Sequence, residues 1–93
     1  MPLVRIELRS GKSPEYRRAI GDAIHQCMVE VLNVPPDDHF QIIAEHAPDS
    51  LIYDPTYLGI SRSDDIVIIQ ITLNQGRTVE MKRRFYSAVA QAL

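Results

Sequence analysis

The sequence predicts a small α/β domain (α+β in some schemes), and three observations carry that prediction. Residues 3–9 alternate apolar and polar side chains, as a half-buried strand does. Residues 14–32 repeat apolar side chains at three- and four-residue steps, which is typical of an amphipathic helix. A nearly continuous β-branched run at 66–73 predicts a central strand covered on both faces. A chain of 93 residues accommodates one domain.

The first strand begins directly behind an amino-terminal Met-Pro pair. Its alternation places Val4, Ile6 and Leu8 on one face. Because proline is small, Met1 is normally removed, which leaves Pro2 with a free secondary amine. An α-amino group titrates at about pH 8, so an amine fixed at the start of a buried strand can act as base or acid near neutral pH.

The helix that follows has clear start and stop signals. Ser13 is a good N-cap, Pro14 suits the first helical position, and Asn33 before a Pro-Pro pair closes the helix. Its apolar stripe needs a sheet or another helix to cover it. The stripe comprises Tyr16, Ala19, Ile20, Ala23, Ile24, Cys27, Met28, Val31 and Leu32.

Two residues of this helix invite a metal or thiol interpretation. His25 and Cys27 are two positions apart on a helix, so their side chains point in different directions. We therefore expect Cys27 to be a small core residue and His25 to be solvated on the polar face. A single cysteine excludes an internal disulfide and a multi-cysteine zinc site.

Residues 39–45 predict a second strand, in which one face carries Phe40, Ile42 and Ala44. Strand, helix and strand with short links form a βαβ unit with parallel strands and a right-handed crossover. Parallel strands begin at the same end of a sheet. The topology therefore predicts that Pro2 and the Asp37-Asp38 pair lie at one end.

The remainder of the chain predicts a connecting segment and a second strand–helix unit. Residues 46–64 are irregular, and we expect a small hairpin arm that packs on a neighbouring subunit. Thr78 caps a second helix with Glu80 in its first turn. The single domain 1–93 thus divides into a βαβ unit (1–45), the arm (46–64) and an incomplete second unit (65–93).

Composition excludes several classes of function. A formal net charge of −2 gives no basic surface for nucleic acid. No apolar run approaches the ~20 residues of a membrane span, so we expect a cytoplasmic protein. A chain this short has a marginal core, which makes a homo-oligomer the expected state.

Four segments, in this order, are similar to those of a known family: 1–5 (MPLVR), 34–41 (VPPDDHFQ), 57–63 (YLGISRS) and 73–78 (LNQGRT). Together they resemble the tautomerase superfamily, and most closely its malonate semialdehyde decarboxylase-like branch. The resemblance implies tautomerase-like βαβ units that pack helices on one face of a mixed sheet, with the second unit truncated. It also implies a trimer or a related assembly, and neither cofactor nor metal.

The resemblance further implies roles for four residues. Pro2 matches the family's catalytic amino-terminal proline, and Asp38 matches an aspartate that orients water or substrate. Arg77 matches one of two arginines that bind the substrate carboxylate. Asn74 stands where the branch has the other arginine, so it donates a hydrogen bond without supplying charge. This departure weakens the case for decarboxylation more than the case for tautomerisation.

Three functions follow as hypotheses. The first is a tautomerase that uses Pro2 as general acid or base on a small 2-oxo or enol carboxylate. The second is a decarboxylase or hydratase of a 3-oxo acid such as malonate semialdehyde, which suits a cationic Pro2. The third is an inactive oligomerisation module, favoured if Met1 stays in place. Burial and Arg77 favour a neutral Pro2 amine and Asp38 favours a cationic one, so the sequence leaves its charge open.

Overall fold

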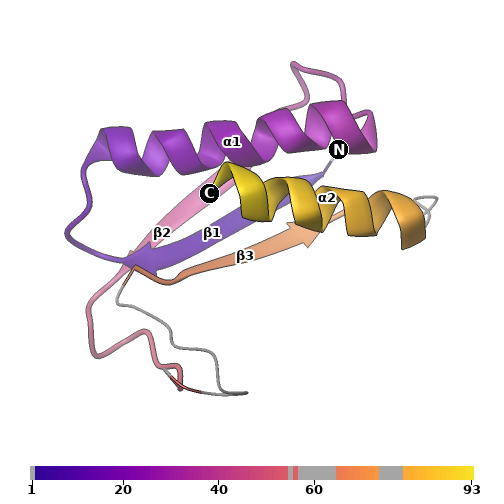
Figure 1. The fold of residues 1–93 in the computed structure, drawn as a ribbon. Helices are drawn as coiled ribbons and strands as arrows, with labels where there is room; N and C mark the ends of the chain where they lie inside the picture. The colour runs from indigo at the N-terminus through magenta and orange to yellow at the C-terminus, as the bar shows by residue number, and fades with distance from the viewer. Residues whose placement is uncertain (1, 55, 57–64, 74–78) are drawn as a thin grey trace.

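A computed structural model of the protein describes residues 2–54, 56, 65–73 and 79–93. The described chain forms three strands and two helices, and both helices lie on the same face of the sheet (Figure 1). The elements follow the order β1 (Leu3–Arg9), α1 (Pro14–Leu32), β2 (Gln41–His46), β3 (Val67–Thr72) and α2 (Val79–Ala92). The predicted two-layer arrangement is therefore confirmed.

The sheet is mixed, with the strand order β2-β1-β3. β1 and β2 are parallel, with Val4 opposite Gln41, as the βαβ prediction requires. β3 runs antiparallel to β1, with Leu3 opposite Thr72. The sheet therefore brings the start of β1, the start of β2 and the end of β3 to one end.

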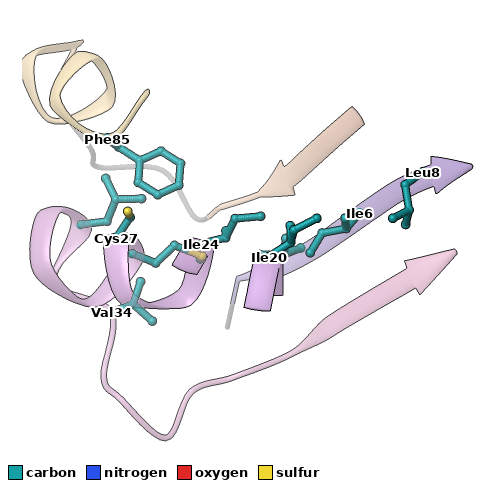
Figure 2. Packing of buried hydrophobic residues seen from close by; sticks show 10 residues of the cluster. Ile6, Leu8, Ile20, Ile24, Cys27, Val34 and Phe85 are labelled. Carbon is teal, nitrogen blue, oxygen red and sulfur yellow. The ribbon is translucent and has the colours of Figure 1, made fainter. Parts of the chain in front are cut away.

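The core lies between the sheet and the two helices (Figure 2). Val4, Ile6 and Leu8 of β1 are buried, which confirms the predicted alternation. Ile24 of α1 is 0% exposed, and Phe85 of α2 is buried in the same cluster. Cys27 is buried in the same cluster, so it is the core residue that the sequence predicts.

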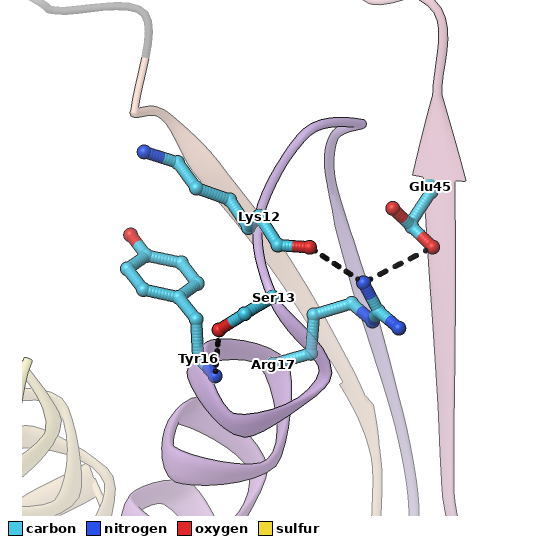
Figure 3. A network of polar contacts seen from close by, with 5 residues as sticks. All are labelled: Lys12, Ser13, Tyr16, Arg17 and Glu45. Atoms are coloured by element: carbon cyan, nitrogen blue, oxygen red, sulfur yellow. Dashed lines mark hydrogen bonds and ion pairs between the residues drawn. The ribbon is translucent and has the colours of Figure 1, made fainter.

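Both ends of α1 carry the predicted caps. The Ser13 hydroxyl accepts a hydrogen bond from the Tyr16 amide at 3.1 Å, and Asn33 adopts a left-handed backbone with φ 58°. Arg17 reinforces the start of the helix, because its Nη1 donates to the Lys12 carbonyl at 2.8 Å and lies 3.3 Å from Glu45 Oε1 (Figure 3). This network ties the first turn of α1 to β2.

β2 turns Gln41, Ile43 and Glu45 toward the helices. Gln41 Nε2 donates to the carbonyl of Gly21 at 2.8 Å, and a Cβ at position 21 would overlap the Gln41 amide. Phe40 and Ile42 do share a face with Ala44, as the pattern predicts, but that face is turned away from the helices and Phe40 is 47% exposed. A side chain at position 21 would therefore displace the Gln41 amide from the Gly21 carbonyl.

The prediction that residues 66–73 form a central strand is wrong for this sheet. β1 is central and β3 lies at an edge, and Ile68 is 41% exposed. The reason is that both helices cover the same face, so the second apolar face of β3 has no cover within the described chain. We call this surface the open face of the sheet and define it as Arg5, Glu7, Ile42, Ala44, Ile68 and Gln70.

The described part of the connecting segment packs on its own chain. Residues 47–54 contain no strand, and a turn closes from the Ser50 amide to the Ala47 carbonyl at 2.9 Å. Leu51 is buried, and the Arg9 guanidinium lies 5.3 Å from the centre of the Tyr53 ring. The expected hairpin arm finds no support in residues 47–54, and most of 55–64 lies outside the described residues.

Candidate functional site

The site predicted from sequence lies at the end of the sheet where β1 begins. The Val4 amide donates to the Phe40 carbonyl at 3.1 Å, so the chain already runs beside β1 just before β2 starts. Leu3 is paired with Thr72, so β3 finishes at the same place. The amino terminus is drawn at this end in Figure 1.

Pro2 is buried at this position. It directly precedes the first paired residue of β1, and that strand is hydrogen-bonded on both sides. A terminus held in this way does not move as an ordinary chain end does. Pro2 is therefore held at a defined place beside the sheet.

Asp38 lies at the same end of the sheet and is half-buried. Its amide donates to the Pro35 carbonyl at 3.0 Å, which closes a turn between α1 and β2. Asp37, the preceding residue, is exposed. Because Asp38 stands two residues before Phe40, the parallel register brings Pro2 and Asp38 to one end, as the topology predicts.

His25 makes two contacts near Asp38 that the sequence does not predict. Its Nε2 lies 2.7 Å from the Pro36 carbonyl, and its ring stacks on His39 with centroids 4.0 Å apart and planes 10° from parallel. The expectation of a solvated His25 is therefore wrong. Helical periodicity reports only which face a residue occupies, and this contact depends on the path of the loop that follows the helix.

Asn74 and Arg77, the predicted carboxylate-binding residues, lie outside the described residues. The same holds for Met1, for the predicted cap Thr78 and for the 57–63 segment. The chain reaches position 74 from Leu73, which follows the residue paired with Leu3. Roles for Asn74 and Arg77 stay predictions.

Three cavities among the described residues lie away from Pro2 and Asp38. One of about 410 Å³ opens between the start of α1 and the end of α2, with Tyr16 and Leu93 in its wall. Another of about 300 Å³ is apolar and lies between β3 and α2. A third, of about 500 Å³, runs along β2 and includes His39 but neither Pro2 nor Asp38.

Two further properties of the described chain bear on its chemistry. Within the described ranges, no three His, Cys, Asp or Glu side chains are grouped as a metal site. Neither described helix is both long enough and apolar enough to cross a bilayer.

Comparison with known proteins identifies the family. Two family models, both described as tautomerase enzyme, match residues 2–61 and 38–93. The chain is 42% identical over 93 residues to the probable tautomerase YusQ of Bacillus subtilis, covering all of this chain and 73% of that protein. It is 33% identical over 93 residues to the probable tautomerase YrdN of the same organism, covering all of this chain and 71% of that protein.

Solved structures agree with the sequence comparison. The FG41 malonate semialdehyde decarboxylase, inhibited by 3-bromopropiolate, is 44% identical with a TM-score of 0.85, over 97% of this chain and 69% of that one. A second malonate semialdehyde decarboxylase, described with decarboxylase and hydratase activities, is 29% identical with a TM-score of 0.87, over the same shares. A fused 4-OT symmetric trimer, 24% identical over 97% of this chain and 69% of that one, shares the fold with a TM-score of 0.77. The chain therefore belongs to the tautomerase superfamily of enzymes, with malonate semialdehyde decarboxylases among its structural relatives.

Proposed function

We propose that this enzyme isomerises a small 2-oxo or enol carboxylate, using the amine of Pro2 as general base and acid after removal of Met1. The observation that carries the proposal is the buried position of Pro2 at the start of a strand paired on both sides. Its family membership supports the reaction class, and the Asp38 turn at the same end supplies a carboxylate.

The reaction requires one proton to move from oxygen to carbon. Neutral Pro2 removes the proton of the enol hydroxyl, and the electron pair moves to form the ketone carbonyl. The carbon–carbon double bond then takes the proton back from cationic Pro2, so nothing is consumed. A general base and acid of this kind contributes about 10²–10⁴-fold in rate.

Binding in this proposal depends on Arg77 and Asn74. A guanidinium binds a carboxylate with two parallel hydrogen bonds, and an amide adds one hydrogen bond without charge. Asp38 orients the reacting end of the substrate or a water molecule.

A second chemistry, decarboxylation or hydration of a 3-oxo acid, is favoured by the 44% identity to the FG41 malonate semialdehyde decarboxylase. Here Pro2 is cationic and polarises the carbonyl. The bond to the carboxylate breaks, carbon dioxide leaves, and the electron pair stays on carbon as an enolate that Pro2 protonates. Asn74 instead of a second arginine favours tautomerisation over this reaction, because the charge that holds the carboxylate is halved.

The open face supports a homo-oligomer, which we propose to be a trimer or a related assembly. It presents Ile42 and Ile68, each 41% exposed, on the side of the sheet that the helices leave uncovered. Exposed apolar residues grouped on a sheet face indicate a surface that another chain covers. We propose a trimer because the fused 4-OT protein of the same fold is a symmetric trimer.

The test compares wild type with Pro2→Ala in ketonisation of phenylenolpyruvate or 2-hydroxymuconate. Replacing the secondary amine is expected to lower kcat/KM by about 100-fold or more. Intact mass must first show that Met1 is absent from both proteins, since a retained Met1 would block the amine. Equal rates in two correctly processed proteins would refute the proposal.

Carbon dioxide release from malonate semialdehyde decides between the two chemistries. Release by wild type at a rate above that for ketonisation, with loss in Pro2→Ala, would make decarboxylation the principal reaction. Ketonisation without carbon dioxide release would exclude decarboxylation.

A further inference from the structure

The turn that carries Asp38 is attached to α1 on both sides of that residue. Before Asp38, the Pro36 carbonyl lies 2.7 Å from His25 Nε2. After Asp38, the ring of His39 stacks on the ring of His25 at 4.0 Å. One side chain of α1 thus contacts the turn at two points that flank the carboxylate.

The contact at Pro36 defines which nitrogen of His25 carries a proton. A carbonyl oxygen can only accept a hydrogen bond, so Nε2 must be the donor. The ring therefore uses an edge to bind the backbone and a face to bind His39. This combination needs a flat aromatic ring with an N–H at its far edge, which histidine supplies and phenylalanine or glutamine supplies only in part.

The Val34 amide donates to the Met28 carbonyl at 3.2 Å, which attaches the loop to α1 before Pro36, and His25 adds contacts on either side of Asp38. The hydrogen bond from the Asp38 amide to the Pro35 carbonyl closes the turn but does not link it to α1. On the other side, the Phe40 carbonyl binds the Val4 amide of β1. His25 therefore connects the turn to the helix layer, while Phe40 connects it to the strand that carries Pro2.

We infer that His25 is a positioning residue that acts through His39 and the Pro36 carbonyl to hold the Asp38 carboxylate at a fixed place relative to the Pro2 amine. The inference rests on the proposed function, because it concerns the two groups assigned to the reacting end of the substrate. In the proposal, Arg77 binds the substrate carboxylate, and His25 acts only on the turn that carries Asp38. Loss of His25 is therefore expected to lower kcat and to leave KM nearly unchanged.

Three variants separate the two contacts. His25→Phe keeps a ring for stacking and loses the N–H donor, whereas His25→Gln keeps a donor and loses the ring. His25→Ala loses both, and we expect kcat to fall about tenfold with KM within about twofold, which equals about 1.4 kcal/mol in the barrier. The two partial variants are expected between wild type and His25→Ala. Gln26→Ala, at the neighbouring exposed position on α1, is the control and should keep wild-type kinetics.

A double-mutant cycle tests whether His25 acts through Asp38. If it does, His25→Ala costs about tenfold in wild type but little when Asp38→Asn is already present. A merely structural role would lower the rate by the same factor in both backgrounds, and that result would overturn the inference. Thermal unfolding of each variant shows whether the proteins compared are folded.

The inference and the proposed function fail in distinguishable ways. An impaired Asp38→Asn with a wild-type-like His25→Ala would overturn the inference and leave the proposed function standing. A wild-type rate in Asp38→Asn would overturn the inference and the role proposed for Asp38, whereas the proposed function falls only if Pro2→Ala keeps the wild-type rate. Nuclear magnetic resonance of ¹⁵N-histidine gives a readout apart from activity: His25 should show a protonated Nε2, and its ring signals should shift in His39→Ala. A His25 protonated only at Nδ1 would contradict the contact itself.

Discussion

The two faces of the sheet are built from the same strands, but only one of them is covered by the helices. On the face toward the helices, Val4, Ile6 and Leu8 are buried and meet Ile24 of α1. On the open face, apolar Ile42 and Ile68 alternate with Arg5 and Glu7, and the described chain provides nothing to cover them. The first face holds the core of the single chain, whereas the second is the face that we propose another copy covers.

The largest expected effect lies on the helix face. Ile24→Ala removes a side chain that is 0% exposed, and we expect it to lower the free energy of unfolding by about 2–5 kcal/mol. The matched control is Ile52→Ala, because Ile52 is 89% exposed and the same atoms are lost without leaving a cavity. Denaturant titrations of both variants measure the difference. A similar loss in the two would mean that the core is not where the structure places it.

The second prediction concerns the open face. Ile68→Lys places a cation opposite Glu7, so the isolated chain should lose less than about 1 kcal/mol. In an oligomer that covers this face, the same cation is buried, and the assembly should dissociate. Light scattering after size-exclusion chromatography reports the mass. An unchanged assembly in Ile68→Lys would show that the subunits associate through another surface.

The smallest effect comes from a titratable group beneath the helix face. Burial, with a smaller contribution from the Glu30 carboxylate, raises the pKa of the Cys27 thiol. The folded chain therefore holds this proton more tightly than the unfolded chain, whose thiol ionises at about pH 8.5. Above that pH the thiol ionises more readily in the unfolded chain, so the free energy of unfolding decreases as pH rises.

This decrease in stability with rising pH should be absent from Cys27→Ala, which has no thiol. We expect the stability advantage of wild type over Cys27→Ala to shrink between pH 8 and 10, by no more than ~1.4 kcal/mol per pH unit. Urea titrations of the two proteins across this range measure it. A constant or growing advantage would mean that the thiol is not shielded from solvent.

The sequence predicts the helix face well because that face obeys local rules. Alternation in β1, the caps Ser13 and Asn33, and the stripe through Ile24 each follow from spacing and residue type. The parallel order of β1 and β2 follows from chain connectivity, and it places Pro2 and Asp38 at one end before any coordinates are known.

The features that the sequence could not provide depend on contacts between distant segments. The apolar residues of β2 and β3 indicate strands, but not which face the helices cover, and so the edge position of β3 was missed. The stack of His25 on His39 needs the path of the loop between them. Asn74 and Arg77 were assigned by family resemblance alone, and their roles stay predictions.

The pairing of β1 on both sides has a practical consequence for anyone who produces this protein. Pairing with β2 and β3 fixes the register of β1 and with it the position of Pro2. A shift of the register by one residue would move Pro2 by about 3.3 Å. A purification tag or a leftover cleavage residue ahead of Pro2 would leave the sheet intact, yet it would convert the proposed reactive amine into an ordinary amide. On the proposed mechanism, a preparation of this kind would fold but show no activity.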